Sequence, residues 1–421
     1  MKKILWLCNM TFSEEKIKTT ASWLQPLAEL LQSSGKVQLF SISLGNIKEV
    51  QQTSYHNIQQ WILPNLNNTH YNQIASQDTC KLIAKIEAEI SPDLVHIWGT
   101  ESIWASVYAK KYIKATTIID IQGLLSSYYY YYYGGLTFNE IIKCISLKEI
   151  LMPWRTLFGK KRVFFKRGKI ETSCLKSFKY ISHQSEWVKN QIQLLPSEAT
   201  FFPTKIMLRT SFYHSSPWQY KTPQDNPVIF TSASGAISYK GIHVLMKSIQ
   251  LLKKKYSHIQ LRIAGQMKIG NLLLDGYSKF ILQLVNRYKL QQNILFLGPI
   301  DEIQIIKELQ NSNVCVVPSF IDAYCLSFAE AMIVGVPTVT SFTGAMPELA
   351  RHGEESLFYN SIDYQTCATY IDQLIQNKEL AEKLSVQARQ RRFIENDPNT
   401  VVSTQLSIYK NIITQSSIIK S

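Results

Sequence analysis

The 421-residue sequence lacks any run of about 20 consecutive apolar residues, the length that a membrane-spanning helix requires. Its N-terminal apolar run, Ile4 to Cys8, is too short for the core of a signal peptide. Leu7 is also not the small residue that a cleavage site prefers. We therefore expect these residues to form a buried first β-strand, and we expect the protein to be cytoplasmic.

Paired cysteines are also missing from the sequence. The seven cysteines are far apart, no two have Cys-x-x-Cys spacing, and their number is odd. These facts argue against a disulfide framework and against a cysteine metal site. We expect buried thiols in a reducing compartment.

Acidic residues are scarce, with 31 Asp and Glu against 45 Lys and Arg, so the net charge is +14. Residues 143–179 hold eleven Lys or Arg and two Glu, and apolar and aromatic residues lie between the charges. Such a segment is typical of contact with an anionic membrane surface, of nucleic-acid binding or of a solvated loop. We favour the membrane, expect no nucleic acid as partner, and expect a peripheral location at the inner face of the membrane.

Hydrophobic periodicity predicts alternating strands and helices in the second half of the chain. Short apolar runs that favour strands alternate with segments of helical spacing at least four times between 227 and 341. This alternation is typical of βαβ units, with a parallel sheet covered by helices on both faces. Expected strands are 227–234, 259–264, 293–297, 314–318 and 337–341, and expected helices are 241–256, 275–288, 301–310 and 326–334.

The first half of the chain shows a similar layout less clearly. We expect an α/β protein with two Rossmann-like domains. The domains are predicted at 1–213, which includes the basic segment 143–179, and at 214–395. A helical segment at 396–421 is expected to pack back toward the first domain. First-half strands are expected at 4–8, 37–42, 94–98 and 116–121, and helices at 14–31, 72–90 and 102–111.

The most informative stretch is Pro318–Ala350, PSFIDAYCLSFAEAMIVGVPTVTSFTGAMPELA. A strand ends at Pro318, a loop carries Asp322, and a helix begins near Cys325. The N-terminus of a helix offers free backbone N–H groups and a partial positive charge, which suit a phosphate. Glu330 follows Asp322 by eight residues, and its carboxylate suits a pair of sugar hydroxyls.

This stretch resembles the donor-binding signature of the family 4 retaining glycosyltransferases, which have the GT-B fold. The shared pattern is Pro-Ser, an acid, Glu-Ala-Met, Gly-x-Pro and then Gly-x-x-Pro-Glu. The acid is Asp322 here, where the family has glutamate. The resemblance implies two Rossmann-like domains whose parallel sheets face each other across a cleft. It also implies that Glu330 holds the ribose of a nucleotide-sugar, and that Asp322 and residues 323–326 face the donor sugar and diphosphate.

Two other positions are similar to the family pattern. Lys240, in Ser238-Tyr239-Lys240-Gly241, stands where the family has a lysine that grips the diphosphate. The family's arginine position falls at Gly235, so charge balance must come from Lys240, from backbone amides or from another cation such as Arg209. Gln122 stands where many members have a histidine. It is a positioning residue, because glutamine is no base and the donor phosphate is thought to take the acceptor proton in this family.

The sequence therefore predicts a retaining, metal-independent glycosyltransferase of the surface-polysaccharide type. It would move a sugar from a nucleotide-diphosphate donor to a glycan acceptor that is lipid-linked. No Asp-x-Asp motif is present, and no cofactor or metal is expected. A nucleotide-sugar epimerase and a non-catalytic binding protein are the alternatives. Catalytic candidates are Lys240, Asp322 and Gln122; donor-binding candidates are Glu330, Ser238, Ala323, Tyr324, Cys325, Leu326, Gly298 and Ile300.

One segment of the first half has an unusual composition. Six consecutive tyrosines occupy positions 128–133, directly after Gln122-Gly123, and two glycines follow them. Tyrosine offers a flat ring face and a hydroxyl group, which suit sugars and interfaces. We interpret this run as an acceptor-binding loop, with a packed, buried loop as the alternative.

Overall fold

The computed structural model describes residues 1–13, 23–65, 73–195, 198–222, 226–233, 235, 237–267 and 274–420. The chain forms two compact units. The first unit consists of Met1–Tyr129, Val163–Met207 and Glu395–Ser421, and the second consists of Tyr130–Arg162 and Leu208–Ile394.

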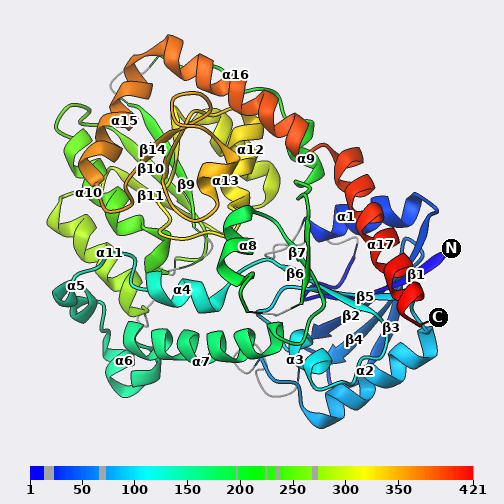
Figure 1. Cartoon of the computed structure of the whole chain (residues 1–421). Helices are drawn as coiled ribbons and strands as arrows, with labels where there is room; N and C mark the ends of the chain where they lie inside the picture. Colours follow the sequence, from blue (N-terminus) through cyan, green and yellow to red (C-terminus); the bar gives the residue numbers. More distant parts are fainter. Residues whose placement is uncertain are drawn as a thin grey trace. The chain divides into compact units, whose positions relative to one another are not determined.

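Eight strands form the sheet of the first unit within the described residues, in the order β3-β4-β2-β1-β5-β6-β7-β8 (Figure 1). All neighbours pair in parallel except β3 and β4. The central strands β5 and β6 are buried along their whole length, as expected of parallel strands with both faces covered. The strands are β1 (Lys2–Leu7), β2 (Val37–Gly45), β3 (Gln51–Tyr55), β4 (Ile58–Pro64), β5 (Leu94–Trp98), β6 (Thr117–Ile121), β7 (Tyr180–His183) and β8 (Thr200–Pro203).

Six strands form the sheet of the second unit in the described part of the chain, in the order β11-β10-β9-β12-β13-β14. Every pair is parallel. The strand order reverses between β9 and β12, which is the point where open α/β sheets bind ligands beyond the strand carboxyl ends. The strands are β9 (Val228–Ser232), β10 (Gln260–Ala264), β11 (Ile294–Gly298), β12 (Val314–Val317), β13 (Thr338–Ser341) and β14 (Leu357–Tyr359).

Helices connect and cover these strands. Those that lie wholly or mostly in the first unit are α1 (Leu24–Ser33), α2 (Gln77–Ile90), α3 (Trp104–Ala109), α4 (Leu125–Tyr131), α7 (Leu157–Leu175), α8 (Glu186–Ile192) and α17 (Pro398–Lys420). The others are α5 (Phe138–Lys143), α6 (Leu147–Leu151), η2 (Pro153–Arg155), α9 (Thr210–Tyr213), η3 (Ser238–Lys240), α10 (Ile242–Leu252), α11 (Gly276–Arg287), α12 (Glu302–Asn311), α13 (Leu326–Val334), α14 (Met346–Leu349), α15 (Tyr364–Gln376) and α16 (Lys378–Glu395).

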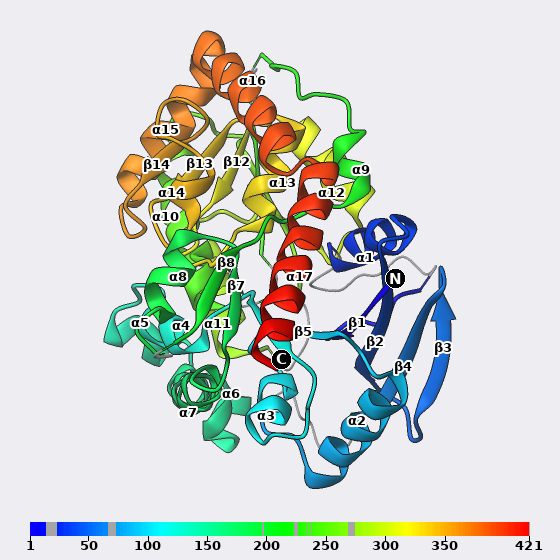
Figure 2. The ribbon, with the colours of Figure 1, turned by 45° about the vertical axis from the view of Figure 1, so that its right-hand side comes forward.

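The chain passes between the units more often than a single boundary near 213 implies. Tyr130–Arg162 belongs to the second unit, so the basic segment 143–179 is divided between the two units and does not lie wholly in the first. The last helix, α17, belongs to the first unit (Figure 2). There the hydroxyl of Tyr409 accepts a hydrogen bond from Trp6 Nε1 at 2.9 Å and pairs with His96 Nδ1 at 2.8 Å. Residues of both halves of the sequence thus complete each unit.

The tyrosine run is not the loop that its composition indicated. Its first residues lie in α4, which begins at Leu125 and ends at Tyr131. The buried carboxylate of Glu171 accepts hydrogen bonds from the amides of Leu125 and Ser126 and so satisfies the start of this helix. Of the helix expected at 14–31, residues 14–22 lie outside the described residues.

The seven cysteines are all free and buried, which confirms the expectation of buried thiols. Among the described residues, no helix is both long and apolar enough to cross a membrane.

Candidate functional site

The carboxyl edge of the second sheet brings several of the predicted site residues together at its switch point. The connection after β9 carries Ser238 and Lys240, and the connection after β12 carries Asp322. Gly241 adopts φ +72° beside the backbone of Pro318, and a Cβ there would overlap the Pro318 carbonyl oxygen. This glycine therefore lets the two connections approach closely.

Lys240 and Asp322 form an ion pair across this switch point. The Lys240 ammonium lies 2.8 Å from Asp322 Oδ1 and 3.1 Å from Oδ2. Burial opposes the charge of Lys240, but Asp322, Cys325 and Tyr239 together raise its pKa above the ordinary value. Asp322 does not cap α13, since the N-cap residue is Cys325 and no side chain bonds there. Lys240 thus presents a fixed positive charge at the carboxyl edge.

A second ion pair joins Arg209 to Glu330 on α13. Arg209 Nε donates to Glu330 Oε1 at 2.8 Å, and Nη2 lies 2.8 Å from the same oxygen. Glu330 is 7% exposed. Burial raises its pKa, and the Arg209 guanidinium acts in the opposite direction. The sequence offered no signal for this pair, because 121 positions separate its two members.

The remaining donor-binding candidates occupy the same edge of the sheet. Ala323 and Cys325 are buried immediately before α13, and Tyr324 and Leu326 are half-buried beside them. Ser238 is buried, and its hydroxyl donates to the carbonyl of Tyr132 at 2.5 Å. The other two, Gly298 (φ +69°) and Ile300, lie at and just beyond the end of β11 and are half-buried.

A pocket of about 550 Å³ lies beyond the carboxyl ends of β13 and β14, also within the second unit. Gly344 lines it, and the next residue, Ala345, donates its amide to the Asp322 carbonyl at 3.0 Å. The pocket therefore adjoins the Asp322 loop. Its lining combines aromatic rings with hydrogen-bonding side chains: Tyr131, Phe342, Phe358, His352, Asn360 and Ser361.

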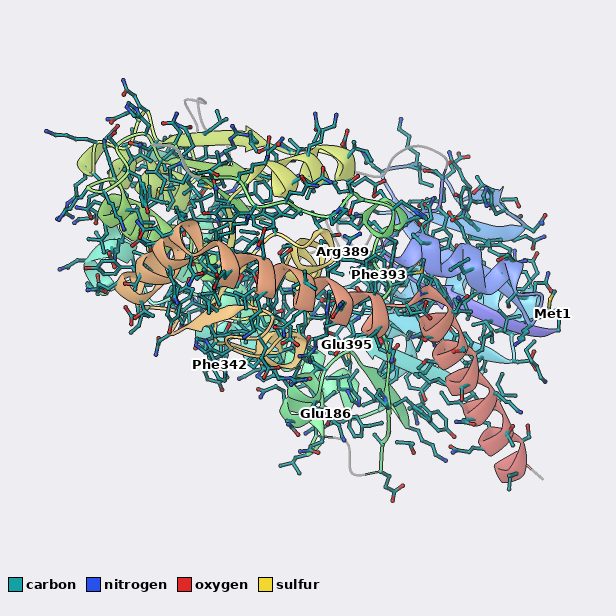
Figure 3. The ribbon with its side chains drawn as sticks, turned by 90° about the horizontal axis from the view of Figure 1, so that it is seen from above. Met1, Glu186, Phe342, Arg389, Phe393 and Glu395 are labelled. Carbon is teal, nitrogen blue, oxygen red and sulfur yellow. The ribbon has the colours of Figure 1, made fainter. Side chains whose placement is uncertain are left out.

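The pocket offers both apolar and polar contacts to a ligand. The ring of Phe342, labelled in Figure 3, is 63% exposed. The amide of Phe358 donates to His352 Nδ1 at 2.9 Å, which leaves Nε2 to carry the ring proton of the neutral imidazole. Exposed ring faces beside hydrogen-bonding groups suit a sugar, whose surface is part apolar and part hydroxyl.

Gln122 lies in the first unit, just after β6. Its Nε2 is buried and has no hydrogen-bond partner among the described residues. An unpartnered buried amide needs an explanation, and a bound hydroxyl group is one. The structure thus places Gln122 at the carboxyl edge of its own sheet, as the sequence predicted.

Two carboxyl groups beside Gln122 were missed by the sequence reasoning. Glu101 follows β5 at the switch point of the first sheet, and its carboxylate lies against the backbones of Gly99 and Gly123. Burial raises the pKa of Glu101 to about 7. Burial also raises the pKa of Asp120 to about 7, against hydrogen bonds from Ser182 and Gln184. Glu101 follows the end of the buried strand β5 by three residues, and an acid in that position is the signal that could have pointed to it.

Comparison with protein families finds one matching family model, and the match lies within the second unit. Residues 215–391 match the model of the family "Glycosyl transferases group 1". An uncharacterized glycosyltransferase of Bacillus subtilis, YqgM, is 27% identical over 179 residues, which are 42% of this chain and 48% of that protein. CapM of Staphylococcus aureus, a capsular polysaccharide biosynthesis glycosyltransferase, is 25% identical over 158 residues, which are 37% and 38% of the two chains. The match thus spans about half the length of these relatives or less.

Solved structures resemble the chain over nearly its whole length. Sucrose-phosphate synthase from Thermosynechococcus elongatus has a TM-score of 0.72 at 15% identity, covering 99% of this chain and 100% of that one. Anabaena Alr3699/HepE, in complex with UDP and glucose, has a TM-score of 0.68 at 14% identity, covering 97% and 99%. These likenesses, with the two α/β units, confirm the predicted GT-B fold class.

Proposed function

We propose that this chain, whose residues 215–391 carry the glycosyltransferase group 1 domain, is a retaining glycosyltransferase that uses a nucleotide-diphosphate sugar. One observation carries the proposal. Lys240 and Asp322 face each other at the switch point of the second sheet, and Glu330 lies on the helix that follows. This is the position at which α/β sheets bind ligands, and its charges suit a diphosphate beside a ribose.

The donor contacts divide between the two ion pairs. Glu330 accepts hydrogen bonds from the ribose hydroxyls, and Arg209 orients its buried carboxylate through an ion pair. Lys240 transfers its contact from Asp322 to the diphosphate, which is the more highly charged partner. Asp322 then accepts from hydroxyl groups of the donor sugar. The backbone around 323–326, at the start of α13, faces the diphosphate.

The reaction breaks the bond between the anomeric carbon and the diphosphate oxygen. The acceptor oxygen forms its bond to the same face of that carbon, and its proton passes to the departing phosphate. Lys240 stabilises the charge that develops on the leaving diphosphate, and such fixed charge is a major source of catalysis. Gln122 positions the acceptor. No metal takes part, so we expect an excess of EDTA to leave the rate unchanged.

We further propose that the acceptor is a lipid-linked glycan for a surface polysaccharide. The likeness to the capsular polysaccharide enzyme CapM and the excess of positive charge in residues 143–179 support this assignment. The enzyme would then work at the inner face of the membrane, in contact with anionic lipid. The pocket beside Asp322 would receive carbohydrate, because Phe342 offers a ring face and His352 offers a donor there.

The test begins with thermal shift against nucleoside diphosphates and their sugars, since a ligand of the folded state raises its melting temperature. The donor found in this way is then incubated with lipid-linked glycans, and the product is examined for its anomeric configuration. A new glycoside with the donor's configuration supports the proposal. Release of a free epimerised sugar would favour the epimerase, and binding without turnover would favour a non-catalytic protein.

A further inference from the structure

The segment that joins α4 to α7 exposes an unusual number of large apolar side chains. Over α6 and η2, Leu147 is 83% exposed, Leu151 is 81%, Trp154 is 64% and Ile150 is 62%. Phe138 and Ile142 of the preceding helix α5 are exposed as well. Single exposed apolar residues need no explanation, but a run of this density on one short segment marks an interaction surface.

This exposure belongs to a firmly held element. The buried carboxylate of Glu149 caps α6 at the Ser146 amide, 3.2 Å away, and also accepts from the Gly276 amide at 3.0 Å. Lys279 donates to the carbonyl of Ile145 at 2.8 Å. The backbone of Cys144 lies so close to Gly276 that a Cβ there would overlap it. Helices α5 and α6 are thus fixed beside α11 (Figure 1). Their apolar side chains Phe138, Ile142, Leu147, Ile150 and Leu151 are nevertheless exposed.

The charges that this segment presents to the solvent are positive. Residues 137–162 contain two acids, Glu140 and Glu149. Glu140 pairs with Lys247 at 3.0 Å, and Glu149 is turned inward to Gly276. The same residues contain six basic side chains, of which three are exposed (Lys143, Arg155 and Arg162) and three are half-buried (Lys148, Lys160 and Lys161).

We infer that α5, α6 and η2 form a bilayer anchor, in which Leu147, Ile150, Leu151 and Trp154 insert below the headgroups of a phospholipid membrane. Apolar side chains beside basic ones are the pattern of helices that lie in the membrane interface. Trp154 and Arg155, adjacent in η2, suit the boundary between acyl chains and headgroups. A second copy of the chain fits less well, because it would bring two surfaces of the same positive charge together.

The anchor belongs to the second unit, which also carries the candidate donor site. The inference rests on the proposed membrane association and specifies the side chains and the unit that make it. It also changes the expected lipid dependence. Contact through charge alone disappears at high salt or on neutral lipid, whereas insertion of apolar side chains persists under both conditions.

The experiment is flotation of the full chain with vesicles of phosphatidylcholine alone, and of phosphatidylcholine with phosphatidylglycerol, at low and high salt. The anchor variant is Leu147→Ser with Leu151→Ser and Trp154→Ser. Its partition onto both vesicle types should fall roughly 100-fold, because three large apolar side chains no longer enter the bilayer. Its melting temperature should stay unchanged, since these side chains are exposed in the folded protein.

Two controls separate insertion from general stickiness and from charge. Leu194→Ser with Val386→Ser removes exposed apolar side chains elsewhere, at 93% and 54% exposure, and should leave flotation unchanged. Lys143→Ala with Arg155→Ala should lower binding to the anionic vesicles at low salt and leave binding at high salt unchanged. Brominated lipid should quench the tryptophan fluorescence of the wild type more than that of the Trp154→Phe variant.

Several outcomes would overturn the anchor. One is flotation of the wild type on anionic vesicles only at low salt, with the anchor variant equal to it. Another is a change from dimer to monomer in the anchor variant, by light scattering, without loss of flotation. The proposed function is tested separately by transfer to a short water-soluble acceptor, which the anchor variant should perform like the wild type. If the wild type transfers no sugar while the anchor variant loses flotation, the proposed function is refuted and the anchor is supported.

Discussion

The two sheets place opposite kinds of chemistry at their switch points. In the second unit, the acids there are paired with cations, Asp322 with Lys240 and Glu330 with Arg209. In the first unit, burial raises the pKa of Glu101 and Asp120 to about 7, so these acids are partly protonated near neutral pH. One edge thus holds its acids in ion pairs, and under the proposed function the Lys240–Asp322 pair opens when a charged ligand binds. The other edge offers neutral donors and acceptors, which suit hydroxyl groups.

Substitution of Glu330 is the most severe test of the second sheet's edge, where the acids are paired with cations. We expect Glu330→Gln to lower transfer by roughly 1000-fold, because a neutral amide replaces the charged acceptor of two hydroxyls. Breaking a buried ion pair also destabilises the fold, so the melting temperature is measured alongside donor affinity. The matched control is Glu308→Gln in the same unit, because Glu308 pairs with Arg262 and is more exposed than Glu330. A folded Glu330→Gln with unchanged donor affinity would refute the ribose assignment.

Removal of Lys240 tests whether the paired edge holds the diphosphate. Lys240→Met should lower kcat/KM by roughly 100-fold, through the lost charge at the leaving group. Affinity for a nucleoside diphosphate should fall, while affinity for the nucleoside alone should change little. Lys253→Met, at the end of α10, is the control lysine variant. An equal loss for nucleoside and nucleoside diphosphate would show that Lys240 acts on the fold and not on the phosphates.

The protonated edge makes a different prediction, about pH. The folded pKa of Glu101, about 7, exceeds its unfolded value of about 4.5, so the folded state binds more protons between these values. The first unit should therefore lose stability as pH rises from about 4.5 to 7, by roughly 2 kcal/mol. Glu101→Gln should make this slope shallower, and the slope that remains should come from Asp120, whose pKa is also raised to about 7. Hydrogen exchange of peptides around 94–101 measures the stability of the first unit alone as a function of pH. The same slope in the variant and the wild type would contradict the raised pKa of Glu101.

The smallest effect concerns the pocket beside Asp322. Phe342→Ala should weaken acceptor binding by roughly several-fold, because one contact between an aromatic ring and the sugar is lost. Donor affinity should stay unchanged. The melting temperature should not move, because the ring is 63% exposed. Val386→Ala, on α16, serves as the exposed control. An effect on donor KM and none on acceptor KM would place the donor sugar in this pocket.

Much of the second unit was predictable from sequence, because its strands are short, buried and separated by helices of clear period. The helix Leu326–Val334 has the predicted limits, and the helix expected at 301–310 is α12, which Asp301 caps. In the first unit, β3 was missed because Gln51–Ser54 are exposed and polar, so no apolar run marks them. The tyrosine run was predicted as a loop because its composition does not indicate a helix. The first turn of α4 is stabilised by Glu171, which lies 46 positions from Leu125 in the sequence.

The candidate site was predictable only where local motifs describe it. Lys240, Asp322 and Glu330 stand in such motifs, and the structure places all three at one sheet edge. Arg209 and Glu101 do not, since the approach of each to its neighbours depends on packing between distant segments. Hydrophobic pattern fixes which strands are buried, but it does not specify which charged side chains then meet at their ends.

The passage of α17 into the first unit has a consequence for synthesis on the ribosome. Trp6 and His96 lie on strands that are translated long before their hydrogen-bond partner Tyr409, which follows them by 403 and 313 positions. Until then the nascent first unit carries an uncovered sheet face and is exposed to chaperones and to aggregation. A chain released early, near residue 394, would leave these two side chains buried without Tyr409 and would be marked for degradation.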